Sequence, residues 1–378
     1  MRILIAYPYI AYQEVALEFL ERLATCGNEV IAIFASDRTK ISCVYKSTLT
    51  QVKFYGVPSM ELNPIIAKSV VQHYPCFLHL SNIIRGVSPD LIVVMSPLFL
   101  ASAQVVKEAI KNKKPSVLEV HGVYAERGLI LRMMQNIYLH TIGRWILENS
   151  TLIRCLHKHD AVELTKFGAP PDKIRIIPNA VDTDLFKPSR EREENSLIWV
   201  GRMVPEKGLT YLIKALTVIV KEYSLKDISL KLIGDGPQLS FLLKMVRKFN
   251  LNKHVRFLGS RSRKEVANML ARSSLFVFPS LREGMPLSVL EAMSCGLPVI
   301  GSRVIGLENL VVNNYNGLLV PPKDPRSLAD AIVLLIVDGN LRRKMAKNAR
   351  DYIMKEHSYD KILPKLQHMY FEALGLHK

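Results

Sequence analysis

The chain has 378 residues, and its 51 lysines and arginines exceed its 34 aspartates and glutamates, which gives a formal net charge of +17. This length is too great for one ordinary hydrophobic core and fits two domains of roughly 150–200 residues each. Apolar residues make up 49% of the sequence and glycine and proline occur at ordinary frequencies, which excludes wholesale disorder, collagen-like chains and low-complexity chains.

The amino-terminal run Ile3–Tyr7 is predicted to be a β-strand rather than a signal peptide, because Pro8 ends it and no small-residue cleavage site follows. No stretch of about 18 clean apolar residues occurs, so we expect no transmembrane helix. The cysteines are odd in number and widely spaced, which argues against a disulfide framework or a zinc site and indicates a reducing, cytoplasmic compartment. They are Cys26, Cys43, Cys76, Cys155 and Cys295.

In the first half, apolar runs alternate with helical patterns. The pattern Gln13–Cys26 predicts a helix that ends before Gly27, a residue suited to the position just after a helix. Further strands are predicted at Val30–Ala35, Leu91–Met95, Ser116–Val120, Leu152–Cys155 and Ile174–Ile177.

The second half repeats this alternation. Strands are predicted at Leu197–Gly201, Leu230–Gly234, Val255–Gly259, Leu275–Pro279 and Pro298–Gly301. Strands that are apolar throughout and alternate with helices indicate parallel sheets covered on both faces. The sequence therefore predicts an α/β protein with two Rossmann-like parallel-sheet domains.

The composition between Pro178 and Ser196, rich in Pro, Asp and charge, is typical of a linker. We expect a first domain over residues 1–180, a linker over 181–195, a second domain over 196–357, and a helix over 358–378 that crosses back to the first domain.

The segment Pro279–Gly296 gives the strongest functional signal. A strand ends at Pro279, a turn is centred on Gly284, and Pro286 suits the start of a helix. The backbone N–H groups of residues 285–288 (Met285, Pro286, Leu287 and Ser288, of which the proline has none) would then face a crevice, which is a site for phosphate. Glu291, one turn deeper, could accept hydrogen bonds from a ribose, while Glu283 could reach a second ligand group. A helix with two solvated glutamates is the alternative.

Two other strand ends carry small or cationic residues. Gly201, Arg202, Lys207 and Gly208 follow one strand, and Arg and Lys side chains together suit a diphosphate. Gly234 ends a third strand in the same half of the chain. An ordinary basic loop is the alternative for each motif alone, but the set describes one nucleotide crevice.

These motifs resemble glycosyltransferase family 4, retaining enzymes of the GT-B fold, whose two Rossmann-like domains face each other across a cleft. The resemblance rests on Glu283-Gly-Met-Pro…Glu291, on Gly201-Arg202…Lys207-Gly208, on Asn316-Gly-Leu-Leu-Val-Pro-Pro and on Pro178-Asn-Ala-Val-Asp182. It covers residues 175–335 closely and the first half loosely.

The resemblance implies roles for these residues. Arg202 and Lys207 would hold the donor diphosphate, Glu291 the ribose and Glu283 the hydroxyls of the transferred sugar. Backbone near Leu258 would contact the base, and His121, which follows the strand Ser116–Val120, would lie near the transferred sugar. Fixed cations and helix N–H groups would stabilise the leaving diphosphate without a metal or any other cofactor.

The leading interpretation is therefore a retaining sugar transferase of the EC 2.4 class. It would move a sugar from a nucleotide-diphosphate donor to a glycan, a lipid-linked molecule or a small molecule. A nucleotide-sugar epimerase of the same architecture and a catalytically silent, polyanion-binding scaffold remain alternatives. We expect no nucleic-acid partner, because no helix-turn-helix, zinc-finger or RRM signature occurs.

Three further segments each allow more than one interpretation. Asp182-Thr-Asp184 is interpreted as a turn rather than a metal site. In Tyr7–Gln13, bulky residues replace the glycines that the family usually carries, so this loop could shape an acceptor site, leave the donor to the second domain, or reduce activity. The segment Glu126–Leu147 carries arginines and is apolar on several helical faces. It could be a core helix, or it could contact the anionic inner surface of a membrane.

Overall fold

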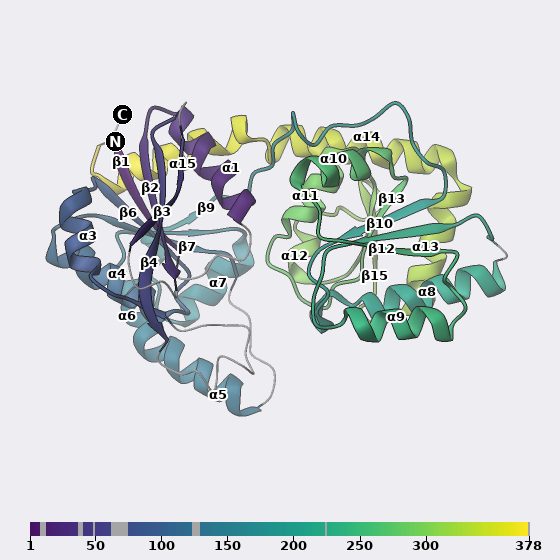
Figure 1. Ribbon diagram of the computed structural model, residues 1–378, viewed down its shortest axis with the longest axis horizontal. Helices are drawn as coiled ribbons and strands as arrows, with labels where there is room; N and C mark the ends of the chain where they lie inside the picture. Colours follow the sequence, from purple (N-terminus) through teal and green to yellow (C-terminus); the bar gives the residue numbers. More distant parts are fainter. Residues whose placement is uncertain are drawn as a thin grey trace. The chain divides into compact units, whose positions relative to one another are not determined.

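The computed structural model describes residues 1–7, 13–36, 41–47, 50–61, 75–122, 129–223 and 225–376. The chain forms two compact units, Met1–Pro178 with Leu363–Lys378, and Asn179–Ile362. The segment 181–195, which we expected as a linker, belongs to the second unit. The last helix, α15 (Tyr359–Ala373), begins in the second unit and continues into the first (Figure 1).

The first unit is built on one mixed sheet, in which nine strands of the described residues take part. Eight of them lie in the order β3-β4-β2-β1-β6-β7-β8-β9, and β5 pairs with β4. Only β3 and β5 run antiparallel to their partner. The strands are β1 (Arg2–Tyr7), β2 (Glu29–Ser36), β3 (Ser42–Lys46), β4 (Val52–Glu61), β5 (Pro75–Phe77), β6 (Leu91–Met95), β7 (Ser116–Val120), β8 (Leu152–Cys155) and β9 (Ile174–Ile176).

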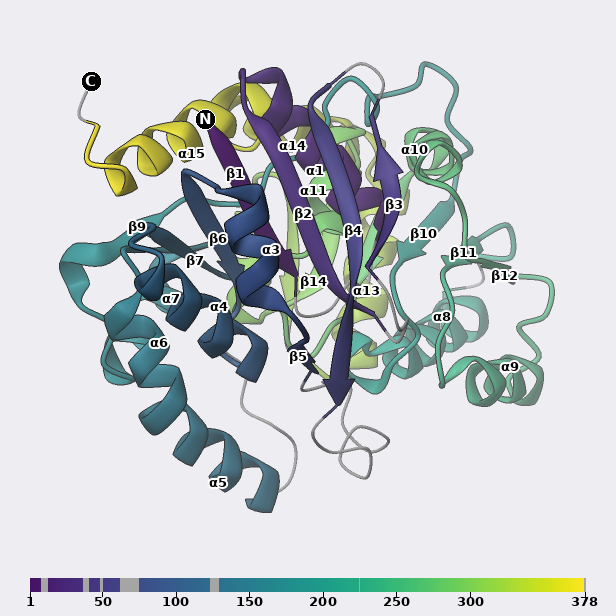
Figure 2. The same cartoon turned by 60° about the vertical axis from the view of Figure 1, so that its left-hand side comes forward.

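Helices cover both faces of this sheet, and strands such as β6, all Leu, Ile, Val and Met, are buried (Figure 2). Gly27 follows α1 with a φ of 82°, as predicted for a residue that ends a helix. A π-helical turn at Leu139–Gly143 joins α5 to α6. The helices are α1 (Gln13–Thr25), α3 (Leu80–Val87), α4 (Leu100–Lys111), α5 (Leu129–Tyr138), α6 (Arg144–Asn149) and α7 (Lys158–Lys166).

The sequence did not predict β3, β4 or β5. Gly56 and Pro58 interrupt the apolar run of β4, and such residues normally argue against an inner strand. The parallel pairing of β4 with β2, from Val30–Val52 to Ser36–Pro58, is what holds it in the sheet. This contact between segments distant in sequence outweighs the local composition.

The second unit has a fully parallel sheet in the order β12-β11-β10-β13-β14-β15. Its strands are β10 (Ser196–Val200), β11 (Ser229–Ile233), β12 (Val255–Gly259), β13 (Leu275–Phe278), β14 (Val299–Ser302) and β15 (Gly317–Val320). The strand β15, which lies at one edge of the sheet within the motif Asn316-Gly-Leu-Leu-Val-Pro-Pro, was not among the predicted strands. Because β10 and β13 are neighbours but not consecutive in the chain, the strand order reverses between them, and ligands bind at such points in α/β sheets.

Helices α8 to α14 cover this second sheet, and several begin at residues that the local sequence explains. Ser262 and Glu265 form a capping box at the start of α10, and Asp324 caps α13 ahead of Pro325. The helices are α8 (Leu209–Glu222), α9 (Leu239–Lys248), α10 (Arg263–Arg272), α11 (Leu287–Ser294), α12 (Ile305–Glu308), α13 (Pro325–Val337) and α14 (Gly339–Glu356).

All five cysteines are free thiols, and two of them, Cys155 and Cys295, are buried. Burial raises the pKa of each of these two thiols to about 12, so neither is a reactive thiolate at neutral pH. Within the described ranges, no helix combines the length and the hydropathy that a bilayer crossing requires.

Candidate functional site

In the second unit, the loops after β10 and β13 are joined at the point where the strand order reverses. The backbone N–H of Leu281 donates to the carbonyl oxygen of Glu206 over 2.7 Å, and the Ser280 hydroxyl oxygen lies 2.9 Å from the same carbonyl oxygen. Both loops leave the carboxyl ends of adjacent strands. The two strongest sequence motifs therefore form one surface.

Lys207 and Glu283 meet across these loops. The Lys207 ammonium lies 2.6 Å from Glu283 Oε1, and Ser280 Oγ donates to the same carboxylate oxygen. The Glu283 side chain is 8% exposed and that of Lys207 is 22% exposed. An ammonium has three N–H donors, so Lys207 can hold Glu283 and still donate to a ligand. The sequence predicted that both residues lie in the site but did not predict the pair.

Two further groups beside this pair could receive an anion. Helix α11 begins after Pro286 without a side-chain cap, and the structure places no described acceptor on the N–H of Leu287 or Ser288. The guanidinium of Arg202 is half-buried, and none of the residues described in the structure pairs with it. Uncapped N–H groups at a helix start and an unpaired guanidinium both favour phosphate.

Glu291 lies one turn into α11 and is only 6% exposed. Its Oε1 accepts a hydrogen bond from Arg263 Nη1 over 2.7 Å, and the Arg263 guanidinium also lies 5.0 Å from the centre of the Phe186 ring. A buried carboxylate must be compensated by a partner, and Arg263 supplies the positive charge here. The sequence did not identify Arg263. It belongs to a basic stretch with nine lysines and arginines between Phe241 and Arg272, where no pattern singles it out.

At two of the predicted glycines, the backbone of another loop lies too close for any side chain to fit. At Gly208, where φ is +67°, a Cβ atom would lie 2.0 Å from the carbonyl oxygen of Pro279. At Gly234, where φ is +122°, a Cβ atom would lie 1.9 Å from the carbonyl oxygen of Gly201. Any side chain at either position would push these loops apart.

The other predicted residues of the second unit lie around this centre. Gly284, Met285 and Pro286 are buried in the loop that leads into α11, and Leu258 lies near the carboxyl end of β12, on the outer edge of the sheet. The buried Asn179 side chain donates to the carbonyl oxygen of Met285 over 3.2 Å. Asn179 thus holds the loop that leads into α11 in place. The sequence did not reveal this supporting role.

Asp182 caps a turn, as predicted. Its Oδ1 accepts from the N–H groups of Asp184 and Leu185, each over 3.0 Å. Among the residues that the structure describes, no group of three or more His, Cys, Asp or Glu side chains is placed to hold a metal ion.

In the first unit, His121 follows β7 and its side chain is 45% exposed. Its Nε2 atom lies 3.4 Å from Oε2 of Glu119, a carboxylate that is only 1% exposed. Arg154 donates to the same oxygen over 3.0 Å, and the Tyr370 hydroxyl of α15 donates to Oε1 over 3.2 Å. The sequence did not single out Glu119, Arg154 or Tyr370, because they come from three distant elements.

Burial by itself would raise the pKa of Glu119, but the positive charge of Arg154 and the contact with His121 lower it to about 2. Burial, with the nearby Glu119 charge, raises the pKa of Tyr7 and of Tyr370 above their ordinary range. At neutral pH the cluster therefore holds one carboxylate and two neutral phenols. The loop over residues 8–12, to which we gave three interpretations, lies outside the described residues.

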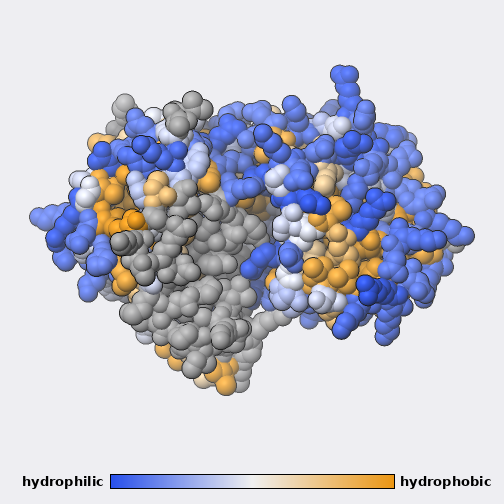
Figure 3. Space-filling model, in the orientation of Figure 1, coloured by the Kyte–Doolittle hydropathy of each residue, from blue (hydrophilic) through white to orange (hydrophobic). Residues whose placement is uncertain are grey.

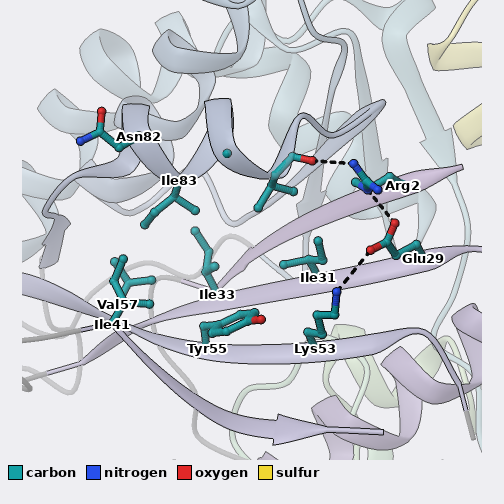
Figure 4. Close-up of a pocket in the computed structure, with 12 residues that line it drawn as sticks. Arg2, Glu29, Ile31, Ile33, Ile41, Lys53, Tyr55, Val57, Asn82 and Ile83 are labelled. Atoms are coloured by element: carbon teal, nitrogen blue, oxygen red, sulfur yellow. Dashed lines mark hydrogen bonds and ion pairs between the residues drawn. The ribbon is translucent and has the colours of Figure 1, made fainter. Parts of the chain in front are cut away.

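A pocket of about 390 Å³ lies elsewhere in the first unit, between α3 and strands β2 and β4 (Figure 4). Isoleucine, valine and tyrosine side chains form its walls. At one end Glu29 pairs with Arg2 over 2.6 Å and with Lys53 over 3.6 Å. None of the predicted site residues lines this pocket, and both of its cations pair with Glu29.

Two family models match the sequence. Glycosyl transferases group 1 matches residues 181–352, and Glycosyltransferase Family 4 matches residues 13–185. An uncharacterized glycosyltransferase of Methanocaldococcus jannaschii is 32% identical over 265 residues, which are 70% of each chain. The chain belongs to glycosyltransferase family 4.

This glycosyltransferase is therefore a transferase of the EC 2.4 class. A UDP-Gal:alpha-D-GlcNAc-diphosphoundecaprenol alpha-1,3-galactosyltransferase of Escherichia coli is 32% identical over 239 residues, 60% of this chain and 61% of that one. The structure of Anabaena HepE in complex with UDP has a TM-score of 0.78 at 18% identity and covers 98% of this chain and 100% of its own. The predicted GT-B fold is thus confirmed.

Proposed function

We propose that this glycosyltransferase transfers a sugar, with retention of anomeric configuration and without a metal, from a UDP-sugar to an acceptor hydroxyl. The observation that carries the proposal is the Lys207–Glu283 pair between the loops after β10 and β13. It places a cation and a carboxylate beside the uncapped start of α11. The UDP-Gal donor of the E. coli relative and the UDP of HepE support uridine as the base.

In this mechanism the anomeric C–O bond to the diphosphate breaks and the acceptor oxygen bonds to the anomeric carbon. The proton of the acceptor passes to an oxygen of the leaving diphosphate. Negative charge grows on that diphosphate, and Lys207, Arg202 and the N–H groups of α11 are fixed before the reaction begins, so they stabilise it without reorganisation. Glu283 would accept hydrogen bonds from the sugar.

Glu291 would accept hydrogen bonds from the ribose, and His121 of the first unit would contact the sugar. The acceptor can be a glycan, a lipid-linked molecule or a small molecule. Retention is supported by the spacing of Glu283 and Glu291, which resembles that of the retaining family, and is tested by NMR of the anomeric proton in the product.

The donor site is tested by a thermal-shift panel of UDP, GDP, ADP and their glucose derivatives, each with Mg²⁺ and with EDTA. A ligand that binds only the folded state at about 100 times its Kd adds roughly 2.7 kcal/mol and raises Tm by several degrees. We expect this shift with UDP and UDP-sugars, unchanged by EDTA and lost in Arg202→Ala. Arg247→Ala, an exposed position on α9, is the control and should keep the shift.

A shift that requires Mg²⁺ would contradict metal independence. The absence of any shift would favour the silent scaffold. An epimerised nucleotide sugar without transfer, seen by chromatography of the products, would favour the epimerase.

Arg263 is expected to act on donor affinity through Glu291. A hydrogen bond to a charged group contributes about 1.5–3 kcal/mol, so Arg263→Gln should raise the KM for the donor about tenfold or more and change kcat less. Arg263→Lys keeps the charge but not the planar fork and should restore part of the affinity. Steady-state kinetics checks this prediction. A decrease in kcat by the same factor as the increase in KM would contradict a role confined to donor binding.

A further inference from the structure

Helix α5 of the first unit carries an apolar face that the described residues leave uncovered. Ile130, Met133, Met134 and Ile137 are 74%, 56%, 50% and 64% exposed. Their spacing of three, four and seven residues places them on one side of the helix. In Figure 3 hydrophobic surface appears at the lower end of the first unit, where Figure 1 shows α5.

This exposure excludes the first of the two interpretations that the sequence allowed for this segment. A core helix with arginines that reach to water would bury these four side chains. Of the polar residues on α5, Arg132 and Asn136 lie on the opposite side of the helix and are exposed. The helix is amphipathic, and neither of its faces is packed in the core.

The one charged residue of α5 itself is a cation, Arg132. From Leu129 to Leu147 the sequence holds Arg132 and Arg144 and no Asp or Glu, in a chain with a net charge of +17. Arg144 pairs with Glu148 at the end of α6, whereas Arg132 lies on the polar side of α5, opposite the apolar face. The turns after α5 add the half-buried side chains of Ile142 and Trp145, 36% and 37% exposed. Apolar and aromatic side chains on one face, with arginine on the polar face, are typical of helices that lie in the interface of an anionic bilayer.

We propose that α5 docks this glycosyltransferase on a membrane, with Ile130, Met133, Met134 and Ile137 inserted at the level of the lipid headgroups and Arg132 near their phosphates. A second copy of the chain is less suited to cover this face. The area of four side chains on one helix falls well short of the roughly 800 Å² per partner that a stable interface buries. The surface is separate from the donor site, so it can be tested independently of the proposed reaction.

The test uses the full chain and vesicles of phosphatidylcholine, with and without about 30% phosphatidylglycerol, at low and high salt. Trp145 serves as a reporter, because the other tryptophan, Trp199, is fully buried. We expect a blue shift of Trp145 emission and co-sedimentation with the anionic vesicles, both weakened by salt and by Arg132→Gln.

The decisive variant is Ile130→Ser with Ile137→Ser, which should lower the partition coefficient about tenfold or more. The matched control is Ile110→Ser with Val162→Ser, two side chains of α4 and α7 that are 48% and 54% exposed, and it should bind as the wild type does. Thermal shift with UDP should be the same in both variants, which separates failure of this proposal from failure of the donor site.

Three results would overturn the proposal. The first is no binding to anionic vesicles at low salt. The second is equal binding by the wild type and by the Ile130→Ser, Ile137→Ser variant. The third is self-association in sedimentation velocity that this variant abolishes, since the face would then join two copies of the chain.

Discussion

Lys207→Ala is expected to lower kcat for sugar transfer by about 10²–10³, because the variant removes a fixed cation from the site where the diphosphate gains charge. The Lys207 ammonium also holds Glu283 over 2.6 Å, so its loss releases the carboxylate proposed to position the sugar. Steady-state release of UDP from a UDP-sugar with acceptor measures the effect. Lys214→Ala, an exposed position on α8, is the control and should retain full turnover.

Glu283→Ala should lower kcat for sugar transfer by a similar factor while leaving the protein folded. Glu283→Gln separates the two contributions of the carboxylate, since the amide keeps a hydrogen-bond acceptor but loses the charge that faces Lys207. Circular dichroism and Tm show whether each variant is folded. Turnover at the wild-type rate by a folded Glu283→Ala or Lys207→Ala variant would refute the assigned site.

Glu119→Gln is expected to destabilise the first unit by about 3–5 kcal/mol, because it leaves the buried Arg154 without its countercharge. The Arg154 side chain is 4% exposed, and its other partners are the neutral carbonyl groups of Ile177 and Pro178. The expected decrease in Tm is on the order of 10 °C. Glu163→Gln removes the exposed ion pair with Lys166 and should change the stability by less than about 1 kcal/mol.

The effect of Glu119 depends on pH in a defined direction. Its pKa in the folded chain is about 2, below the ordinary glutamate value of 4.5, so its charge stabilises the folded state fully above about pH 4.5. This stabilisation decreases as the pH falls from there towards 2. The difference in Tm between wild type and Glu119→Gln should therefore be constant from about pH 5 to 8 and shrink below that range. A constant difference down to pH 3 would contradict the lowered pKa.

The ion pair of Lys207 with Glu283 joins two motifs that lie 76 residues apart in sequence. Each motif alone has an ordinary alternative, a basic loop or a solvated glutamate. The hydrogen bond from the Leu281 N–H to the Glu206 carbonyl brings the loops together, and Gly208 allows the approach because it has no Cβ. Local sequence selects the residue types, and the parallel pairing of β10 with β13 makes them one site.

Local sequence by itself determined the parallel core of both units. The run Leu91–Met95 was predicted with its observed bounds, since a strand buried on both faces is apolar at every position. Local sequence also determined the residues around β10, β11 and β13, because glycine, cation and helix-start signals follow each strand within a few residues. These features depend on residues that lie near one another in the sequence.

The tertiary structure decided the rest. It brought Arg263 to Glu291, brought Arg154 and Tyr370 to Glu119, and placed β4 beside β2, because each of these contacts joins residues from separate elements. It also showed that the apolar residues of α5 are exposed, although the same letters would suit a buried helix. Hydrophobic periodicity specifies which face of a helix is apolar, and only packing against the remainder of the chain determines whether that face is covered.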